Sequence, residues 1–276
     1  MSVKIVVDSS VDLIPELKAQ VKTVALSVLF DGQEYKDGVT IDPEKFYEML
    51  AQSETLPTTS QPTPAAFEDA YRELVEAGHE VLVITVGSKL SGTYQSATIA
   101  ADEFPGKVFV LDSRTVAIGS ALLAMSALKL AEEGLSAQQI LEVLMEKRKK
   151  VHLYAMVDTL EYLKKGGRLS STVAFVGGVL NLKPIISVED GEIQVIGKAR
   201  GLKAAFGALT KTCQETGVDL AEPYLLGYTG TSNENLTKYV EENADLWSAD
   251  SEKMIIGSAI GTHAGPGAVA VAFYVK

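Results

Sequence analysis

The order of strands and helices in this chain predicts an α/β protein of two domains, residues 1–157 and 158–276. In the first half, short apolar strands alternate with helices, a pattern typical of a mainly parallel sheet with helices on its faces. In the second half, a hairpin and single strands lie among helices, which indicates an α+β domain with a mixed sheet. The chain is long enough to bury a substantial core.

Turn and cap residues define the elements of the first half. Asp31-Gly32 is a hairpin signal, and proline stands at the first helical position after Asp42 and after Thr63. Ser136 and Gln139 form a capping box at the start of a later helix. In chain order we expect strand 4–7, helix 11–19, strands 24–29 and 33–35, helices 42–53 and 63–77, strand 81–86, a helix after residue 91, strand 108–111, a helix that ends at 133, and a helix and a strand that run to 157.

Glycines and a second hairpin signal define the elements of the second half. Asp190-Gly191 between two apolar strands indicates a type I′ turn. Gly166-Gly167 ends one helix, and Ser170-Ser171 is suited to cap the next. In chain order we expect helices 158–165 and 172–180, strands 185–188 and 192–196, helix 202–216, strand 224–227, helix 234–242, and strands 253–256 and 268–275.

Composition and charge exclude several classes of function. A net charge of −11 makes a nucleic-acid backbone an unsuitable partner. The single cysteine, Cys213, allows neither a disulfide framework nor a cysteine-based metal site, and we expect no metal and no other cofactor. The N-terminus runs straight into a strand without a signal peptide, and no apolar stretch is long enough to span a bilayer. We therefore expect a cytoplasmic protein.

Three short polar segments, each at an expected backbone turn, form the candidate functional site: residues 58–62, 90–96 and 261–267. The first two precede helices, whose N-termini offer free N–H groups and partial positive charge to an anion. The third places His263 among three glycines and a proline, which indicates a constrained loop. If the segments converge, they form a pocket for a carboxylate or a phosphate. Simple helix caps, and an ordinary turn before the last strand, explain the same residues without a ligand.

Other polar residues have a functional and a structural explanation. The pairs Asp8-Ser9 and Asp112-Ser113 follow strands at the carboxyl edge of the parallel sheet, where ligands of such sheets bind, but they are also suited to cap the next helices. Arg168, after a glycine pair, is either a clamp for phosphate or carboxylate or a solvated side chain. The sequence has no G-x-G-x-x-G, Walker A, G-x-S-x-G or H-E-x-x-H motif, so it indicates no nucleotide site and no catalytic residues.

Six motifs occur in a fixed order along the chain: Val6–Leu13, Thr59–Pro62, Leu90–Ala97, Leu160–Ser170, Leu180–Ile185 and Gly261–Gly267. Taken together they resemble the DegV family, the fatty-acid-binding proteins that serve a bacterial fatty acid kinase. One short match is weak, but the ordered set spans nearly the whole chain and is specific. The last motif departs from the family's usual Thr-His-Thr-Gly-Pro-Gly, because Ala264 replaces the second threonine.

The resemblance implies a long-chain fatty acid in an apolar tunnel between the two domains. It implies that the hydroxyls of Thr59 and Ser91 hold the carboxylate, with His263 beside it. A buried carboxylate needs such bonds, because an unpaired buried charge is very unfavourable. A proton on His263 would then offset negative charge as the carboxylate reacts. The carboxylate-binding residues that we predict are Thr59, Ser60, Ser91, Gly92, Thr93 and His263.

The resemblance also implies a protein partner. A separate kinase subunit phosphorylates the bound acid from ATP and forms an acyl phosphate, so the chain itself presents the substrate and is not an enzyme. Arg168 then acts in phosphoryl transfer or kinase docking. We expect no nucleic-acid partner and no integral membrane contact, only transient contact with a membrane surface.

Two other functions stay open on the sequence. The first is a free-standing phosphotransferase or hydrolase that uses His263 and a serine. The second is a binding module for a different apolar acid. Turnover of ATP or acyl phosphate by the purified chain alone would indicate the enzyme, and the lipid in organic extracts of the protein would separate the two kinds of binding module.

Overall fold

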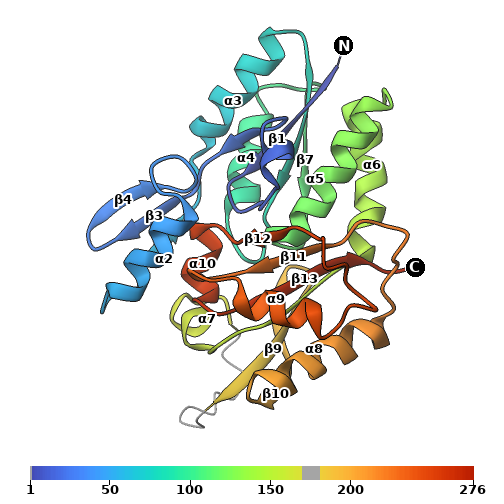
Figure 1. The fold of residues 1–276 in the computed structure, drawn as a ribbon. Coiled ribbons are helices and arrows are strands. Elements are labelled where there is room, and N and C mark those ends of the chain that lie inside the picture. The colour runs from blue at the N-terminus through green and yellow to red at the C-terminus, as the bar shows by residue number, and fades with distance from the viewer. Residues whose placement is uncertain (1, 170–180) are drawn as a thin grey trace.

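The computed structural model describes residues 2–169 and 181–276, whose strands form three sheets. A four-stranded parallel sheet lies in the N-terminal half, and a six-stranded mixed sheet lies in the C-terminal half (Figure 1). A small three-stranded antiparallel sheet lies beside them. The predicted α/β class, with a mainly parallel sheet followed by a mixed one, is confirmed.

The parallel sheet is buried on both faces, which explains its continuous apolar strands. Phe67 and Tyr71 pack on one face, and Leu122 packs on the other. The strands, in sheet order, are β2 (Lys22–Val24), β1 (Val3–Asp8), β6 (Glu80–Thr85) and β7 (Val108–Asp112). The helices are α3 (Pro64–Glu76) and α4 (Thr93–Ala101) on the first face, and α5 (Ala117–Glu132) and α6 (Ala137–Lys147) on the second.

The six-stranded sheet begins before the predicted domain division at residues 157–158. Its strand β8 (Val151–Met156) precedes that division and pairs with β9 (Leu182–Glu189) and β13 (Val269–Tyr274). The division itself stays a prediction. Helices α8 (Leu202–Thr216) and α9 (Glu234–Glu241) cover the outer face. In sheet order the strands are β10 (Glu192–Arg200), β9 (Leu182–Glu189), β8 (Val151–Met156), β13 (Val269–Tyr274), β11 (Leu225–Tyr228) and β12 (Lys253–Ile255), and only β11 and β12 pair in parallel.

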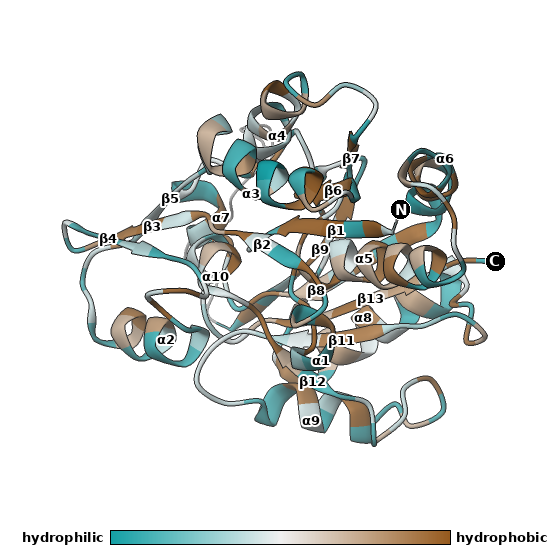
Figure 2. Cartoon of the chain, turned by 90° about the horizontal axis from the view of Figure 1, so that it is seen from above, coloured by the Kyte–Doolittle hydropathy of each residue, from teal (hydrophilic) through white to brown (hydrophobic). Residues whose placement is uncertain are grey.

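Helix α5 is the layer that joins the two large sheets. It contacts β1 and β6 of the parallel sheet and β8, β11 and β13 of the mixed sheet, and Figure 2 shows it between β1 and β13. Its first eight residues are all buried. Many of them are alanine, glycine or serine, so both sheets can approach the helix closely. Apolar residues from both halves thereby join in one cluster around α5.

A third unit stands beside the two large sheets and contributes to the site. Strands β3 (Ser27–Phe30), β4 (Gln33–Lys36) and β5 (Thr58–Ser60) form its sheet, with helix α2 (Pro43–Gln52) packed nearby. Helices α10 (Ser258–Ala264) and α7 (Glu161–Lys165) come from the C-terminal half and lie against each other.

Asp31 and Gly32, between β3 and β4, both have positive φ, 48° and 78°, as a type I′ turn requires. The remaining short helices are α1 (Pro15–Lys18) and the 3₁₀ turn η1 (Arg148–Lys150).

Several local predictions are confirmed. Both bonds of the capping box of Ser136 and Gln139 are present, and the side chains of Asp42 and Thr63 cap α2 and α3. The predicted helix 202–216 coincides with α8. The predicted helix 172–180 and its caps Ser170-Ser171 lie outside the described residues. No helix of the described part is long and apolar enough to cross a membrane.

Four predictions of local structure are wrong. The predicted strand 24–29 is two strands in different sheets, because Val24 ends β2 and the next strand, β3, begins at Ser27. Residues 58–60, where a turn is expected, form a strand that pairs with β3. Helix α1 begins only at Pro15; Ile14 has ψ 150°, since the residue before a proline avoids the helical region. Residues 258–264 form α10 where the glycines suggest a loop. Packing between other elements stabilises this short helix, which ends at Gly265 with φ 69°.

The fit of α10 against α2 gives a prediction on stability. A methyl group at Gly261 would collide with the Tyr47 hydroxyl and the Phe46 ring, whereas one at Gly207, an exposed position in α8, would meet no atom within 4 Å. We expect Gly261→Ala to lower the free energy of unfolding by about 1–3 kcal/mol. The matched control Gly207→Ala should raise it by about 0.4–1 kcal/mol. Urea unfolding followed by circular dichroism measures both, and equal effects of the two substitutions would contradict this packing.

Candidate functional site

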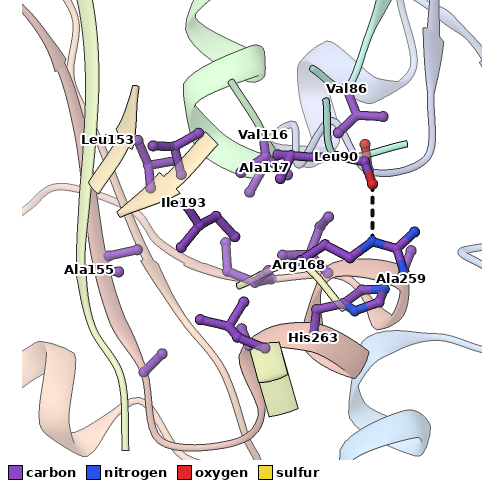
Figure 3. Close-up of a pocket in the computed structure, with 18 of the residues that line it drawn as sticks. Val86, Leu90, Val116, Ala117, Leu153, Ala155, Arg168, Ile193, Ala259 and His263 are labelled. Carbon is purple, nitrogen blue, oxygen red and sulfur yellow. Dashed lines mark hydrogen bonds between the residues drawn. The ribbon is translucent and has the colours of Figure 1, made fainter. Parts of the chain in front are cut away.

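An apolar cavity lies between the two large sheets, beside the first turn of α5 (Figure 3). It offers about 100 Å³ to the centres of water-sized molecules. Most of its wall is aliphatic, contributed by the loop after β6, the start of α5, the inner face of the mixed sheet and α10. An apolar cavity has few groups that hold water, so it suits an apolar ligand. The polar lining residues are Ser10, Thr59, Ser91, Arg168, Thr229 and His263.

Small side chains on the inner face of the mixed sheet make room for this cavity. Ala155 of β8 lies directly opposite Ala270 of β13, and both line the cavity. Because side chains alternate along a strand, the neighbours Tyr154 and Val271 point to the outer face and pack under α8 and α9. The sheet is therefore filled with large side chains on one face and hollowed on the other.

One end of the cavity is polar. Thr59 Oγ1 lies 2.8 Å from His263 Nε2, so a strand and a helix 204 residues apart meet there. Figure 3 shows Arg168 and His263 at this end, with Leu153 and Ala155 at the opposite end. The cavity can thus take an elongated molecule with one polar terminus.

Strand register places Thr59 in this site. Thr59 pairs with Val28 of β3, and the alternation along β5 leaves its neighbour Ser60 exposed on the other face. Ser60, which the sequence analysis includes among the carboxylate-binding residues, therefore does not line the cavity.

His263 stands in the last turn of α10, packed over Gly166. Its Nδ1 is buried and has no hydrogen-bond partner among the described residues, and any side chain at residue 166 would collide with this ring. Burial, and then the nearby Arg168 cation, lower the pKa of His263 to about 4. The imidazole is therefore neutral near pH 7, and the hypothesised proton on His263 requires the negative charge of a ligand.

Ser91 enters the cavity from the loop before α4. Its hydroxyl lies 2.8 Å from Thr93 Oγ1 and accepts a hydrogen bond from the Thr93 N–H at 3.3 Å. Thr93 is fully buried, and Gly92 lies so close to the Gln61 side chain that a Cβ would collide with it. Of Ser91, Gly92 and Thr93, the three predicted carboxylate-binding residues of this loop, only Ser91 lines the cavity; Gly92 and Thr93 shape the loop that carries it.

Arg168 is held at the polar end by two backbone carbonyls. Its Nε donates to the Leu90 carbonyl at 3.0 Å, the dashed line in Figure 3, and its Nη1 donates to the Gly166 carbonyl at 2.7 Å. No carboxylate of the described part of the chain forms an ion pair with it. A fixed guanidinium without a carboxylate partner is suited to bind an anion.

A second, polar cavity lies on the other side of this cluster. Its volume is about 410 Å³, and it shares Thr59, Arg168 and His263 with the apolar cavity. Tyr162 and Lys165 of α7 are among its other lining residues. A group bound at the shared cluster can therefore be reached from the polar cavity while its tail occupies the apolar one.

The residues at the carboxyl edge of the parallel sheet make local bonds. Asp8 accepts from the N–H groups of Ser10 and Val86, which ties two cavity-lining loops together; burial raises the pKa of Asp8 to about 6. Asp112 accepts from the N–H groups of Ser88 and Arg114. Neither Asp8 nor Asp112 caps the next helix, because α1 and α5 have no side-chain cap; both carboxylates instead hold the loops that follow the strands.

Other lining residues could not be recognised from the sequence. Thr229 and the alanines of the mixed sheet have the composition of ordinary core. The only signal is the alternation of alanine with larger residues in 268–272. The described residues contain no group of three or more His, Cys, Asp or Glu side chains that could hold a metal ion.

Comparison with known proteins gives matches over the full length. The model of the DegV family matches residues 2–276. A DegV domain-containing protein of Caldanaerobacter subterraneus is 38% identical over 282 residues, which cover 99% of each chain. One of Deinococcus radiodurans is 38% identical over 279 residues, which cover 99% of this chain and 98% of the relative.

Solved structures share the fold. A DegV family protein from Thermus thermophilus, described by its fatty acid binding, has a TM-score of 0.90 and 33% identity, with 100% of both chains covered. DegV from Bacillus subtilis, described as a fatty acid binding protein, has a TM-score of 0.84 and 30% identity over 100% of both chains. With a family match over residues 2–276 and relatives 38% identical over nearly its whole length, this chain belongs to the DegV family.

Proposed function

We propose that this protein binds a long-chain fatty acid in the apolar cavity and presents its carboxylate, at Thr59, Ser91 and His263, to a separate ATP-dependent fatty acid kinase. The observation that carries the proposal is an apolar cavity that ends in a cluster of hydroxyl, imidazole and guanidinium groups. The fatty acid binding of the structurally similar proteins from Thermus thermophilus and Bacillus subtilis supports it.

The two ends of the cavity match the two ends of a fatty acid. Transfer of each methylene from water into an apolar wall contributes about 0.8 kcal/mol, so the aliphatic lining favours a long chain. The carboxylate leaves water at the same time and needs hydrogen bonds there. The hydroxyls of Thr59 and Ser91 can donate such bonds.

The polar cavity supports presentation to a partner rather than storage alone. A carboxylate at Thr59 and His263 faces this cavity, so a phosphoryl donor held by another protein can reach it. Attack of a carboxylate oxygen on the terminal phosphorus of ATP forms the acyl phosphate and releases ADP. The chain has no nucleotide-binding motif of its own, which agrees with a kinase that brings the ATP.

The direct test is the lipid content of the purified protein. We expect organic extracts to contain fatty acids in about equimolar amount to the protein, and mass spectrometry would give their chain lengths. Delipidated protein should take up an added fatty acid. An extract free of fatty acids, together with no uptake of added C14–C18 acids, would overturn the proposal, whereas a different apolar acid in the extract would indicate another ligand.

The carboxylate site is tested by removing its hydroxyls. Each hydrogen bond to a charged group contributes about 1.5–3 kcal/mol, so the double variant Thr59→Ala with Ser91→Ala should weaken fatty acid binding about a hundredfold or more. Ser60→Ala is the matched control, because Ser60 is exposed on the opposite face of β5. Titration calorimetry on delipidated protein measures all three chains. An unchanged dissociation constant in the double variant would refute the assignment.

Arg168 separates binding from phosphoryl transfer. We expect Arg168→Ala to keep fatty acid uptake and to lose most acyl phosphate formation with the cognate kinase and ATP. Arg168→Lys should not restore the rate, because an ammonium cannot reproduce the two-pronged contact of a guanidinium with phosphate. Arg200→Ala, an exposed arginine on β10, is the control. Normal turnover by Arg168→Ala would contradict this role, and loss of lipid binding would place Arg168 in the carboxylate site.

A further inference from the structure

Two acidic side chains from the N-terminal half hold the start of α10. The Gly257 N–H donates to Asp12 Oδ1 at 2.9 Å, and the next N–H, of Ser258, donates to Asp37 Oδ1 at 3.1 Å. Gly257 is the N-cap and has no side chain that could make this bond itself. Consecutive N–H groups bind the two acids, so the two carboxyl groups are neighbours.

The remaining oxygen of each acid is buried without a partner. Asp12 Oδ2 and Asp37 Oδ2 have no hydrogen-bond partner among the described residues, and neither has the Ser258 hydroxyl. Asp12 is 9% exposed and Asp37 is 2% exposed. A bare carboxylate oxygen in such a place is unfavourable, and two neighbouring carboxylates repel each other. A proton on the pair removes both penalties.

The surroundings favour the protonated form. Burial first, and then the charge of Asp37, raise the pKa of Asp12 well above its usual value. Burial also raises the pKa of Asp37, opposed by the nearby Ser9 and Ser258 hydroxyls and by the Ser258 and Ala259 N–H groups; Oδ2 itself has no hydrogen-bond partner among the described residues. The titratable groups that face the pair, or that line the cavity of about 390 Å³ beside it, are Asp8, Lys18, Glu44, Tyr47, Tyr228, Glu252 and Lys253. Through this cavity water can exchange protons with the pair.

The position of α10 decides the position of His263. The helix has seven residues, and His263 is its sixth. The hydroxyl of Tyr47 donates to the Ile256 carbonyl at 2.9 Å, just before the helix, and Gly265 lies directly against the Tyr162 ring at its other end. A shift at residues 257–258 therefore changes the contact between His263 and Thr59.

We propose that Asp12 and Asp37 are positioning residues of the ligand site: a proton held on the pair lets both carboxyl groups keep α10, and with it His263, in place. Loss of the proton leaves two like charges side by side and loosens the start of the helix. This inference rests on the proposed fatty acid binding, and it assigns a role to the Asp12 that the sequence motif 6–13 contains.

The sign of the pH effect follows from the raised pKa values. The folded chain holds protons that the unfolded chain releases above about pH 4, so the free energy of unfolding falls as the pH rises through the raised values. Asp37→Asn keeps the Oδ1 acceptor and is neutral at every pH, so it imitates the protonated acid. Asp37→Ala removes the bond to Ser258 altogether.

The test compares these variants between pH 6.5 and 9.5 in two measurements, the binding of the fluorescent fatty acid cis-parinaric acid and urea unfolding of the ligand-free chain. We expect the wild-type affinity to fall about tenfold or more as the pH rises. A pKa of the acid pair that is about one unit higher in the ligand-bound chain than in the free chain gives this factor. Asp37→Asn should flatten this profile and bind more tightly than wild type at pH 9.5. Asp37→Ala should bind weakly throughout, and Glu44→Gln, an exposed acid beside the same cavity, should follow wild type.

The two measurements separate this inference from the proposed function. If Asp37→Asn shows the pH profile of wild type in both measurements, the inference is overturned. It is also overturned if Asp37→Asn changes the affinity and the free energy of unfolding by the same amount at every pH, because that indicates a merely structural role. If neither wild type nor Asp37→Asn binds cis-parinaric acid, but Asp37→Asn still flattens the pH dependence of unfolding, the role of the two acids in positioning α10 is supported and the proposed fatty acid binding is contradicted.

Discussion

Helix α10 is held in place by side chains from both halves of the chain, and the site depends on it. Asp12 and Asp37 bind its first N–H groups, and Gly261 packs against Tyr47 in its middle. A seven-residue helix is too short to be stable alone, so these contacts, rather than its own propensity, give it a structure. Because the contacts come from distant segments, the end that carries His263 is fixed only when the whole chain has folded.

The charges around the cavity are arranged for an incoming anion rather than for a resident ion pair. His263 is neutral near pH 7, since burial and Arg168 lower its pKa to about 4. Arg168 is oriented by the carbonyls of Leu90 and Gly166 instead of by an acid. Under the proposed function a carboxylate ligand brings the negative charge, and the hydroxyls of Thr59 and Ser91 can bond to it without a permanent charge of their own.

The pattern of residues in the sequence predicts some residues of this cavity, but it does not reveal strand pairing or the cavity wall. Thr59, Ser91 and His263 could be proposed because they stand in polar segments that match the ordered motifs of the DegV family. Ser60 was included with Thr59, but strand pairing, which the segment 58–62 does not reveal, turns neighbouring side chains to opposite faces. The residues of the cavity wall cannot be predicted from the sequence, because alanines such as Ala155 and Ala270 look like ordinary core residues there. Only their pairing across two strands places these small side chains together and leaves space beside the sheet.

The sequence by itself determined the local elements: the type I′ turn at Asp31-Gly32, the capping box at Ser136, and the alternation of strands and helices that specifies a parallel sheet followed by a mixed one. These features depend on bonds and dihedral angles within a few residues of each other. Only the tertiary structure decided that residues 258–264 are helical and that Thr59 meets His263 across 204 residues. Both outcomes depend on packing between distant segments, whose energy exceeds the weak local preference of a glycine-rich loop.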